Sequence, residues 1–437
     1  MKFLVILILL LSGCTKTKVN PSTPPTDPTT GGTRPRITDE QLLDSVQLKT
    51  FRYFWDFGHP VSGLARERND PNSRDVVTTG GTGFGIMAII VAADRKWITR
   101  EEAATRISKM VSFLEKADRF HGVFPHWLNG ATGKVIPFST FDDGGDLVET
   151  SFLMEGLICA RQYFTENTPL ETNLRTNIQT MWEAVEWNWH TQGGQNVLYW
   201  HWSPNSAWRM NHKLNGWNEA LVTYVLAAAS PKYAIGKAVY DQGWATGTDF
   251  KNGRSYYGIP LPLGPDAGGP LFFSHYSFLG LNPHELKDQY GDYWTQNRNH
   301  TLINYQYCLA NPKGFRGYGP NCWGLTASDN FQGYAAHSPT NDLGVISPTA
   351  ALSAFPYTPE QSMDALKYFY YNLGDKIWGQ YGFVDAFSLD RNWQATSYLA
   401  IDQGPIVGMI ENHRSGLLWR LFMSSPEAKS GLSKLGF

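Results

Sequence analysis

The sequence contains few cysteines and no compact metal-binding motif. Four cysteines occur in 437 residues. Three of them, Cys159, Cys308 and Cys322, follow the N-terminal region and cannot all pair, so no disulfide framework holds the fold. Cys159 lies in an apolar helical run and is expected to be a buried thiol. A disulfide between Cys308 and Cys322 is an alternative that the sequence does not decide. Neither H-E-x-x-H nor C-x-x-C occurs, so we expect no metal and no cofactor in catalysis.

Basic tracts and long apolar runs are also scarce. The formal net charge is −2 and no basic run occurs, so we expect no nucleic-acid partner. The apolar run at residues 3–11 is shorter than the ~20 residues that span a bilayer, and no other run is long enough. A contact with the membrane is therefore expected only through a lipid anchor.

The N-terminal segment has the features of a lipoprotein signal. Lys2 precedes the apolar run, and small residues lead to Cys14, which is the order of a lipobox. We expect residues 1–13 to be removed, Cys14 to be acylated, and the protein to be a cell-envelope lipoprotein of the outer membrane. An ordinary signal peptide with a chance cysteine is the alternative.

A flexible tether and one large domain are expected after this signal. Residues 14–36 are rich in Thr, Pro, Gly and Ser, a composition that cannot bury a core. Residues 37–437 contain no second linker of this kind. We therefore expect a single domain, acting as a monomer.

Helical periodicity dominates the domain and predicts an all-α fold. Thr99 and Thr358 stand where helix N-caps are expected. Strand signals are short and fit small hairpins at residues 123–124, 127–128, 135–136 and 197–198. Twelve helices in pairs with long loops indicate an (α/α)6 toroid with a cleft on one side. The expected helices are residues 39–57, 83–95, 99–118, 146–165, 170–190, 217–230, 232–243, 271–280, 286–310, 346–354, 359–374 and 401–423.

Aromatic residues are abundant, with 16 Trp, 21 Tyr and 24 Phe. Several occur in polar, glycine-rich segments, where rings can stack on the apolar faces of sugars. Packing in the core is the alternative for each single ring. As a set they favour a polysaccharide or oligosaccharide partner, and the candidates for substrate contact are Tyr199, Trp202, Trp217 and Trp323.

Hydrolysis of a glycoside requires two carboxyl groups, one on each side of the scissile bond. The densest group of acids is the segment Asp142-Asp143-Gly-Gly-Asp146-Leu-Val-Glu149. Asp146 and Glu149 also fit a helix capping box, which would explain these two without a function. Four acids in eight residues repel one another, so we expect a compensating partner or perturbed pKa values. At least one of the acids is expected in the cleft.

Two further acids stand at helix openings. Glu219 follows Trp217 and precedes an apolar helix, so it is either a first-turn acid favoured by the helix dipole or a buried general acid. Asp402 lies before Gln-Gly-Pro at the start of the last predicted helix. Asp329 and Asp385 are additional loop acids. The segment Gly83-Phe-Gly-Ile-Met-Ala matches a dinucleotide fingerprint, but no βαβ pattern surrounds it.

Several segments together resemble a known family. They include Phe-Arg-Tyr-Phe-Trp at 51–55, Gly-Trp-Asn-Glu-Ala at 216–220 and Cys-Trp-Gly-Leu-Thr-Ala-Ser-Asp at 322–329, with residues 63–68, 82–85, 141–150, 269–272 and 400–405. In this order, over residues 42–423, they resemble the glycoamylase-like domain of bacterial lipoproteins. Within that group they are similar to the endo-β-1,2-glucanases of glycoside hydrolase family 144.

The resemblance implies an (α/α)6 barrel and an inverting hydrolase that cleaves β-1,2-glucan to sophoro-oligosaccharides. Glu219 matches the general acid of the family, and Asp402 matches a position on the base side. Asp142, Asp146 and Glu149 match acids that are essential to the cleft. The glycine pair at 144–145 departs from the family pattern, which bears on endo or exo action.

Arg66 and Arg68, in a polar loop after the first helix, are expected to bind sugar hydroxyls, with a solvated surface pair as the alternative. Asp329 is a further candidate for substrate binding. Two rival functions stay open: a glycan-binding lipoprotein without catalysis, and an exo-acting, sophorose-releasing or other glucan hydrolase on the same fold. Reducing-sugar release separates the first rival from a hydrolase.

Overall fold

The structure is a computed structural model, and residues 34–437 are described. The predicted signal peptide, the lipidation site at Cys14 and most of the tether lie outside the described residues.

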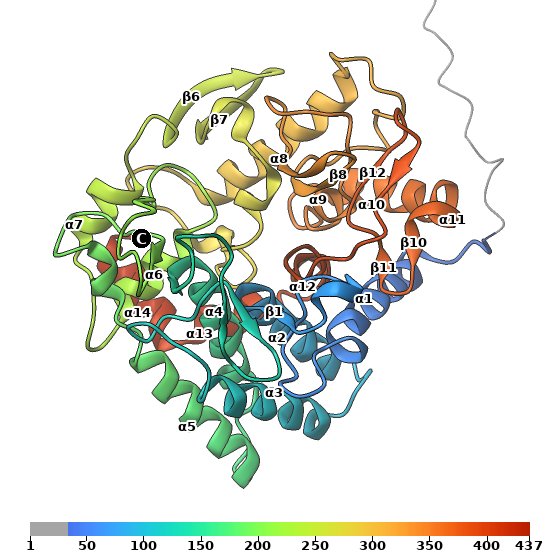
Figure 1. Ribbon diagram of the computed structural model, residues 1–437. Coiled ribbons are helices and arrows are strands. Elements are labelled where there is room, and N and C mark those ends of the chain that lie inside the picture. Colours follow the sequence, from blue (N-terminus) through green and yellow to red (C-terminus); the bar gives the residue numbers. More distant parts are fainter. Residues whose placement is uncertain (1–33) are drawn as a thin grey trace, which may run out of the picture.

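The described chain is mostly helical (Figure 1). Helices predominate, and every strand belongs to a small antiparallel sheet. The helices are α1 Asp39–Asp56, α2 Thr79–Asp94, α3 Arg100–Leu114, α4 Leu147–Tyr163, α5 Pro169–Glu183, α6 Leu221–Ala229, α7 Lys237–Val239, α8 Tyr293–Ala310, α9 Pro348–Leu352, α10 Pro359–Lys367, α11 Gly374–Ile377, α12 Ala400–Arg414, α13 Leu417–Ser424 and α14 Pro426–Leu435.

Helices α2, α4 and α12 form the middle of the molecule (Figure 1). Residues 79–93 of α2 and residues 147–161 of α4 are buried without interruption. The flanking helices α1, α3 and α5 each bury one face and expose charged residues on the other. An inner layer of helices that is buried on all sides, covered by amphipathic helices, is the pattern expected of two-layered helical packing.

Glycines allow α2 and α4 to pack backbone to backbone. A Cβ added at Gly83 would lie 2.1 Å from the carbonyl oxygen of Phe152, and one at Gly156 would lie 2.2 Å from the carbonyl oxygen of Gly83. Only a residue without a side chain fits such a contact. The glycines around Phe84 therefore serve helix packing, which agrees with the rejection of a dinucleotide fingerprint.

The predicted N-cap at Thr99 is confirmed. Its hydroxyl accepts from the backbone N–H of Glu102, and the Glu102 carboxylate accepts in return from the Thr99 N–H. The prediction at Thr358 is wrong in part, because Thr358 stands at the N-cap position of α10 without a side-chain cap. Its hydroxyl donates instead to the Ala354 carbonyl, in the turn between α9 and α10.

Several predicted helices differ from those of the structure. Residues 232–243 contain only the short α7 followed by a π-helical turn, and residues 271–280 contain a single 3-10 turn. The predicted helix 401–423 is two helices, because Gly416 adopts a φ of +68° between α12 and α13. Ser425 then caps α14, which periodicity did not predict. A left-handed glycine ends a helix even where the apolar pattern continues.

Within residues 34–437 the strands form six small antiparallel sheets in the segments that connect the helices. Predicted strands at residues 127–128 and 135–136 are confirmed, whereas those at 123–124 and 197–198 are wrong. Val123 forms an isolated bridge with Phe120, and residues 197–198 lie in a loop with a bend. The observed strands are β1 Val76–Thr78, β2 Trp127–Asn129, β3 Val135–Ile136, β4 Gly145–Asp146, β5 His201–Trp202, β6 Lys251–Tyr256, β7 Ile259–Leu263, β8 Ala327–Asn330, β9 Gly333–Ala336, β10 Trp378–Gly379, β11 Gly382–Phe383, β12 Phe387–Ser388 and β13 Trp393–Gln394.

The β6–β7 hairpin was not predicted. Tyr257 and Gly258 connect its strands with φ of +54° and +78°, and two positive φ values fit a tight hairpin turn. Its strand β6 is largely exposed, so no alternation of buried and exposed residues marks it in the sequence.

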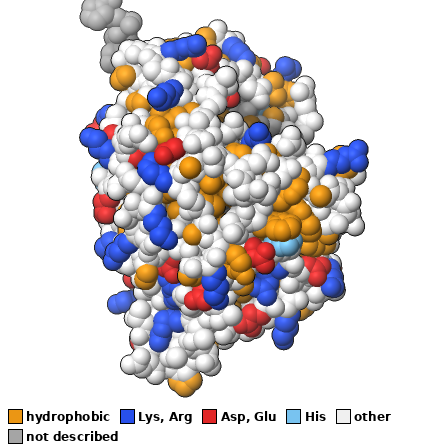
Figure 2. Space-filling model, turned by 90° about the vertical axis from the view of Figure 1, so that its left-hand side faces the viewer, with side chains coloured by type: hydrophobic (Ala, Val, Ile, Leu, Met, Phe, Trp, Pro, Cys, Tyr) orange, Lys and Arg blue, Asp and Glu red, His pale blue; other side chains and the backbone are white. Residues whose placement is uncertain are grey.

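None of the helices in residues 34–437 combines the length and the apolar character needed to cross a bilayer. On the face in Figure 2, Lys and Arg side chains are interspersed with Asp and Glu. Cys159, Cys308 and Cys322 are buried free thiols, so the disulfide left open between Cys308 and Cys322 does not form in this structure.

Candidate active site

Long loops and helix starts enclose a cavity of about 360 Å³. Its acidic residues are Glu67, Glu149 and Glu219. The remaining lining is largely aromatic and apolar, with one arginine, and consists of Arg68, Thr78, His126, Trp127, Phe138, Trp200, Phe272, Tyr276, Ala327, Tyr334, Leu399 and Ile401. Aromatic walls with convergent polar groups are typical of a ligand site.

Glu219 stands two residues before α6, at the cavity wall. The residue is 8% exposed, and the Ser277 hydroxyl donates to its backbone carbonyl. Burial raises the pKa of the Glu219 carboxyl to about 7, and the nearby charge of Glu149 acts in the same direction. A carboxyl group with this pKa is protonated in part of the molecules at neutral pH, as a general acid must be.

Glu149 lies in the first turn of α4 and faces the start of α2. Its Oε2 accepts from the backbone N–H of Gly80 at 2.7 Å and from the hydroxyl of Thr78 at 3.4 Å. Burial raises its pKa to about 7, which the Gly80 N–H opposes. Donors at a helix N-terminus favour the charged form of a carboxylate, and the charge of His126 also lowers the pKa of Glu149. With these opposing effects, the pKa values of Glu149 and Glu219 are both raised to about 7.

Asp146 and Asp142 lie behind the wall and do not line the cavity. Asp146 is fully buried and caps α4, accepting from the Glu149 N–H at 2.9 Å and from Trp200 Nε1 at 2.8 Å. His126 Nδ1 is 3.0 Å from Asp146 Oδ2. Burial opposes protonation of His126, but Glu149 and Asp146 raise its pKa to about 10.

His201 is the second histidine near these acids. Its Nε2 lies 3.4 Å from Asp142 Oδ2 and 3.8 Å from Asp146 Oδ2. Burial and the charge of Asp146 raise the pKa of Asp142 to about 7. The compensating partners and perturbed pKa values expected for the acid cluster are thus present.

Asp402, in the first turn of α12, is 2% exposed and lies behind Tyr276. The Tyr276 hydroxyl is 3.5 Å from Asp402 Oδ1. Its carboxyl group also contacts that of Asp385, and burial together with Asp385 raises the pKa of Asp402 well above the usual value. Two adjacent buried carboxyl groups are stable when they share a proton.

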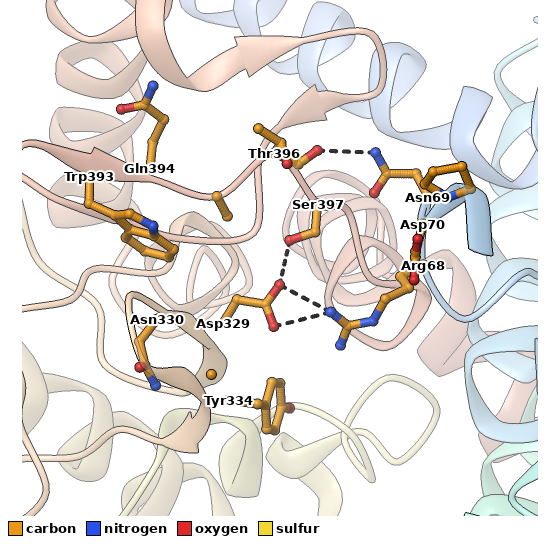
Figure 3. A pocket seen from close by; sticks show the side chains of 13 residues that line it. Arg68, Asn69, Asp70, Asp329, Asn330, Tyr334, Trp393, Gln394, Thr396 and Ser397 are labelled. Carbon is orange, nitrogen blue, oxygen red and sulfur yellow. Dashed lines mark hydrogen bonds and ion pairs between the residues drawn. The ribbon is translucent and has the colours of Figure 1, made fainter. Parts of the chain in front are cut away.

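A second cavity of about 750 Å³ adjoins the first, and both are lined by Arg68 and Tyr334. Figure 3 shows Asp329 between Arg68 and Ser397 in this outer cavity. Arg68 Nη1 lies 3.2 Å from Asp329 Oδ2, which also accepts from the Ser397 hydroxyl. The backbone N–H of Asp329 donates to Asp385 Oδ2 at 2.7 Å, which links the outer cavity to the buried acid pair.

Comparison with known proteins places the chain in a family. Residues 211–426 match the family described as "Putative glucoamylase", and residues 48–143 match a family described as a protein of unknown function, DUF3131. An endo-β-1,2-glucanase from Chitinophaga pinensis, in complex with sophorotriose and glucose, is 55% identical with a TM-score of 0.89. That similarity covers 92% of this chain and 99% of the other. The chain belongs to the glycoamylase-like family that includes the endo-β-1,2-glucanases of glycoside hydrolase family 144.

Two other family members are similar over nearly the whole described domain. A structure from Bacteroides uniformis, with the same designation as the matching family, is 56% identical with a TM-score of 0.91, covering 92% of this chain and 98% of that one. An exo-β-1,2-glucooligosaccharide sophorohydrolase (non-reducing end) from Parabacteroides distasonis is 49% identical over 420 residues. The match covers 91% of this chain, which spans only 58% of the length of that relative.

The predicted catalytic acids of this glycoamylase-like domain, with Arg68 and Asp329, separate into residues that line a cavity and residues that are buried behind its wall. Glu149, Glu219 and Arg68 line the inner cavity, and Asp329 lines the outer one. Asp142, Asp146 and Asp402 are buried behind the inner wall. Their predicted catalytic roles therefore require action through another residue.

Arg66 is held away from the cavities. Its guanidinium donates to the backbone carbonyls of Arg74 and Phe57 and lies over the Phe57 ring. The prediction of a sugar contact at Arg66 is corrected, because this arginine fastens the loop after α1.

Three of the predicted aromatic contacts are also corrected. Trp217 packs among Trp244, Phe278 and Tyr293, and its burial removes it from substrate. Trp323 and Tyr199 are likewise buried, at 0% and 2% exposed. Trp202 is half-buried but belongs to a separate aromatic group and lines neither cavity.

Sequence reasoning missed several residues of the site. His126, Tyr276 and Tyr334 line the inner cavity, and His201 faces the buried acids. The unusual segment Tyr199-Trp200-His201-Trp202 was a usable signal for His201 and Trp200. Tyr276 and Tyr334 lie in segments with no distinguishing pattern, and only the fold brings them to the cavity.

Proposed function

We propose that this protein is a β-1,2-glucan hydrolase that acts with inversion, with Glu219 as the general acid. The observation that carries the proposal is the presence of Glu219 and Glu149 in one aromatic cavity, where burial raises the pKa of Glu219 to about 7. Glycoside hydrolysis needs one protonated and one ionised carboxyl group. The β-1,2-glucanase from Chitinophaga pinensis, 55% identical, supports the linkage.

Glu219 and Glu149 differ in the donors that reach them. Glu149 accepts from Gly80 and Thr78 at the start of α2, which stabilises its anion. The charge of Glu149 raises the pKa of Glu219, so ionisation of Glu149 favours the protonated form of Glu219. In the proposed reaction Glu219 protonates the leaving glycosidic oxygen, and Glu149 accepts a proton from the attacking water.

Asp402 is the water-side carboxyl that the family resemblance implies. Burial behind Tyr276 and the contact with Asp385 favour a protonated Asp402, which cannot act directly as a base. We therefore assign Asp402 to positioning Tyr276 in the wall of the cavity, and we compare Asp402 with Glu149 by mutation.

Endo action is proposed over exo action. The inner cavity shares Arg68 and Tyr334 with an outer cavity of about twice its volume, so a glucan chain that passes between them would have room to extend beyond the acids. The sophorohydrolase from Parabacteroides distasonis is exo-acting, which makes release of sophorose alone the alternative outcome.

The test is incubation with β-1,2-, β-1,3-, β-1,4- and α-1,4-glucans, with product length followed over time. Early sophoro-oligosaccharides of mixed length from β-1,2-glucan support the proposal. Sophorose as the first and sole product indicates exo action. If none of the glucans yields new reducing ends, the protein is a glycan-binding protein without catalysis. Proton NMR of the first product should show the α-anomer, since inversion at a β-linkage yields it.

We also propose that six helical pairs surround the site as an (α/α)6 toroid. The buried helices α2, α4 and α12 and their amphipathic neighbours support this arrangement. Lipidation of Cys14 and an outer-membrane location are proposed from the sequence alone.

A further inference from the structure

The third acid of the inner cavity, Glu67, has no part in the proposed proton transfers. It lies in the segment between α1 and β1, is half-buried, and lines the cavity together with Glu149 and Glu219. The segment 63–68 that contains it is one of those that carry the family resemblance. A carboxylate in the wall of a ligand cavity is expected to bind part of the ligand.

The backbone of Glu67 is fixed on both sides. Its N–H donates to the carbonyl of Val76 in β1 at 3.1 Å, and its carbonyl accepts from the N–H of Ala400, the first residue of α12, at 3.0 Å. The hydroxyl of Tyr53 in α1 donates to the carbonyl of the preceding residue, Arg66, at 2.8 Å. Three elements thus hold the position of Glu67 before a ligand arrives, which lowers the entropy lost on binding.

The carboxylate of Glu67, in contrast, forms no hydrogen bond and no ion pair within the described part of the chain. Both flanking arginines are engaged elsewhere, Arg66 with backbone carbonyls and Arg68 with Asp329. A polar group that is withdrawn from water is normally paired, so an unpaired one calls for an explanation. A ligand that supplies hydrogen-bond donors would provide the missing partners.

The chemistry of the cavity restricts such a ligand. A carboxylate only accepts hydrogen bonds, through two oxygens, and three acids in one cavity disfavour an anionic ligand. Glu67 therefore suits neutral hydroxyl groups, whose bonds to a charged acceptor are stronger than those to a neutral one. In an interior unit of β-1,2-glucan the linkages leave the 3- and 4-hydroxyls free as an adjacent pair. These can donate to the two oxygens of one carboxylate, while the aromatic walls contact the apolar faces of the sugar.

We propose that Glu67 binds two neighbouring hydroxyl groups of a glucosyl unit in the inner cavity. The proposal rests on the β-1,2-glucan hydrolysis proposed for this cavity, in which Glu219 and Glu149 act on the scissile bond. The hydroxyls do not react, so Glu67 holds them equally in the ground state and the transition state. Loss of such an interaction raises KM and leaves kcat unchanged.

Glu67→Gln keeps the shape of the side chain but removes its charge and one acceptor oxygen. KM for β-1,2-glucan should rise about 10-fold, the effect of losing one hydrogen bond to a charged group, with kcat nearly unchanged. Glu67→Asp retains the charge but withdraws it by one CH₂ group, and it should also raise KM. Glu115→Gln, at an exposed position beyond α3, is the control and should keep the wild-type KM. Thermal unfolding of each variant tests for a loss of folding.

Sophoro-oligosaccharides that lack the 3- or the 4-hydroxyl test the contact directly. Each deoxygenation should raise KM for the wild type. The same change should cost Glu67→Gln less, because the bond that it removes is already lost. Losses that add in full, from the residue and from the hydroxyl, would overturn the contact.

Two further results separate the role of Glu67 from the function of the cavity. Unchanged KM in Glu67→Gln beside a wild type that cleaves β-1,2-glucan would overturn the role of Glu67 alone, whereas a wild type that cleaves no β-1,2-glucan would overturn both proposals. A fall in kcat of about 10²–10⁴-fold at constant KM would also overturn the binding role, since Glu67 would then transfer a proton.

Discussion

The carboxylate of Glu149 accepts a hydrogen bond from the backbone N–H of Gly80 at 2.7 Å, although 69 positions separate them in the chain. This contact joins the first turn of α4 to the first turn of α2. It is close because position 80 carries no side chain: a Cβ there would lie 2.6 Å from Glu149 Oε2. The orientation of the Glu149 carboxylate thus depends on Gly80, a residue without a functional side chain.

Gly80→Ala should displace the Glu149 carboxylate and reduce kcat. A misplacement of about 1 Å can cost on the order of 100-fold in rate, and we expect a loss of 10- to 100-fold by this principle. Steady-state kinetics on β-1,2-glucan measure it. Gly236→Ala is the control, because a Cβ there meets no atom within 4 Å, and its kinetics should match the wild type. Equal activity in both variants would show that Glu149 needs no fixed position.

Glu149→Gln and Asp402→Asn test which of the two carboxyl groups accepts the proton of the attacking water. If Glu149 accepts the proton, its loss should lower kcat by about 10²–10⁴-fold. Asp402→Asn should cost less, because the amide can still accept from Tyr276. The two kcat values, measured on one substrate with circular dichroism as a folding control, decide the assignment. A larger loss in Asp402→Asn would return the base role to Asp402.

Arg68→Ala should weaken substrate binding. Arg68 lines both cavities and pairs with Asp329, and a hydrogen bond to a charged group contributes about 1.5 kcal/mol, or roughly 10-fold in KM. Arg66→Ala is the matched comparison. It should lower Tm more than it changes KM, since Arg66 binds backbone carbonyls. Identical kinetic effects of the two substitutions would contradict the placement of Arg68 at the cleft.

Local patterns in the sequence predicted the long helices well. The capping residue Thr99 and apolar periodicity located α1, α3 and α4 closely, because those signals act within one or two turns. The helix predicted at residues 170–190 continues seven residues beyond the end of α5 at Glu183. The split between α12 and α13 and the loss of a helix at residues 232–243 were not predicted. The split occurs at the left-handed Gly416, and apolar periodicity alone reveals neither such a break nor the loss of the helix at residues 232–243.

The sequence identified the types of residue in the site but not how deeply each side chain is buried. Asp146 and Glu149 are three residues apart, yet one is fully buried and the other lines the cavity. The first turn of α4 directs them to opposite sides of the wall. The same limit applies to Trp217 and Trp323, whose glycine-rich neighbourhoods suggested exposure although both rings are core residues. His201 reaches the acids only through the strand pair β4–β5, a contact between segments 55 positions apart.

Cys14→Ala tests the predicted lipid anchor. Stable membrane attachment requires acyl chains, because each buried CH₂ contributes about 0.8 kcal/mol. The variant should therefore move from the detergent phase to the aqueous phase in detergent partitioning, or stay unprocessed. Cys159→Ala is the control, as Cys159 is a buried thiol, and it should partition with the wild type. Equal partitioning of both variants in the detergent phase would refute the lipobox.

Glu219→Gln tests the general acid and its pH dependence. The substitution keeps the shape of the side chain and removes the proton, so kcat should fall by about 10²–10⁴-fold while binding of sophoro-oligosaccharides is retained. The pKa of Glu219 is raised to about 7 by burial, and the active form is the protonated one. Wild-type activity should therefore decline as the pH rises through about 7, and the residual activity of Glu219→Gln should lack this decline.

Glu115→Gln, at an exposed position beyond α3, is the control for Glu219→Gln and should keep the wild-type rate and pH profile. A variant that retains both the rate and the alkaline decline would exclude Glu219 as the proton donor, since the proton that limits the reaction would then come from another group.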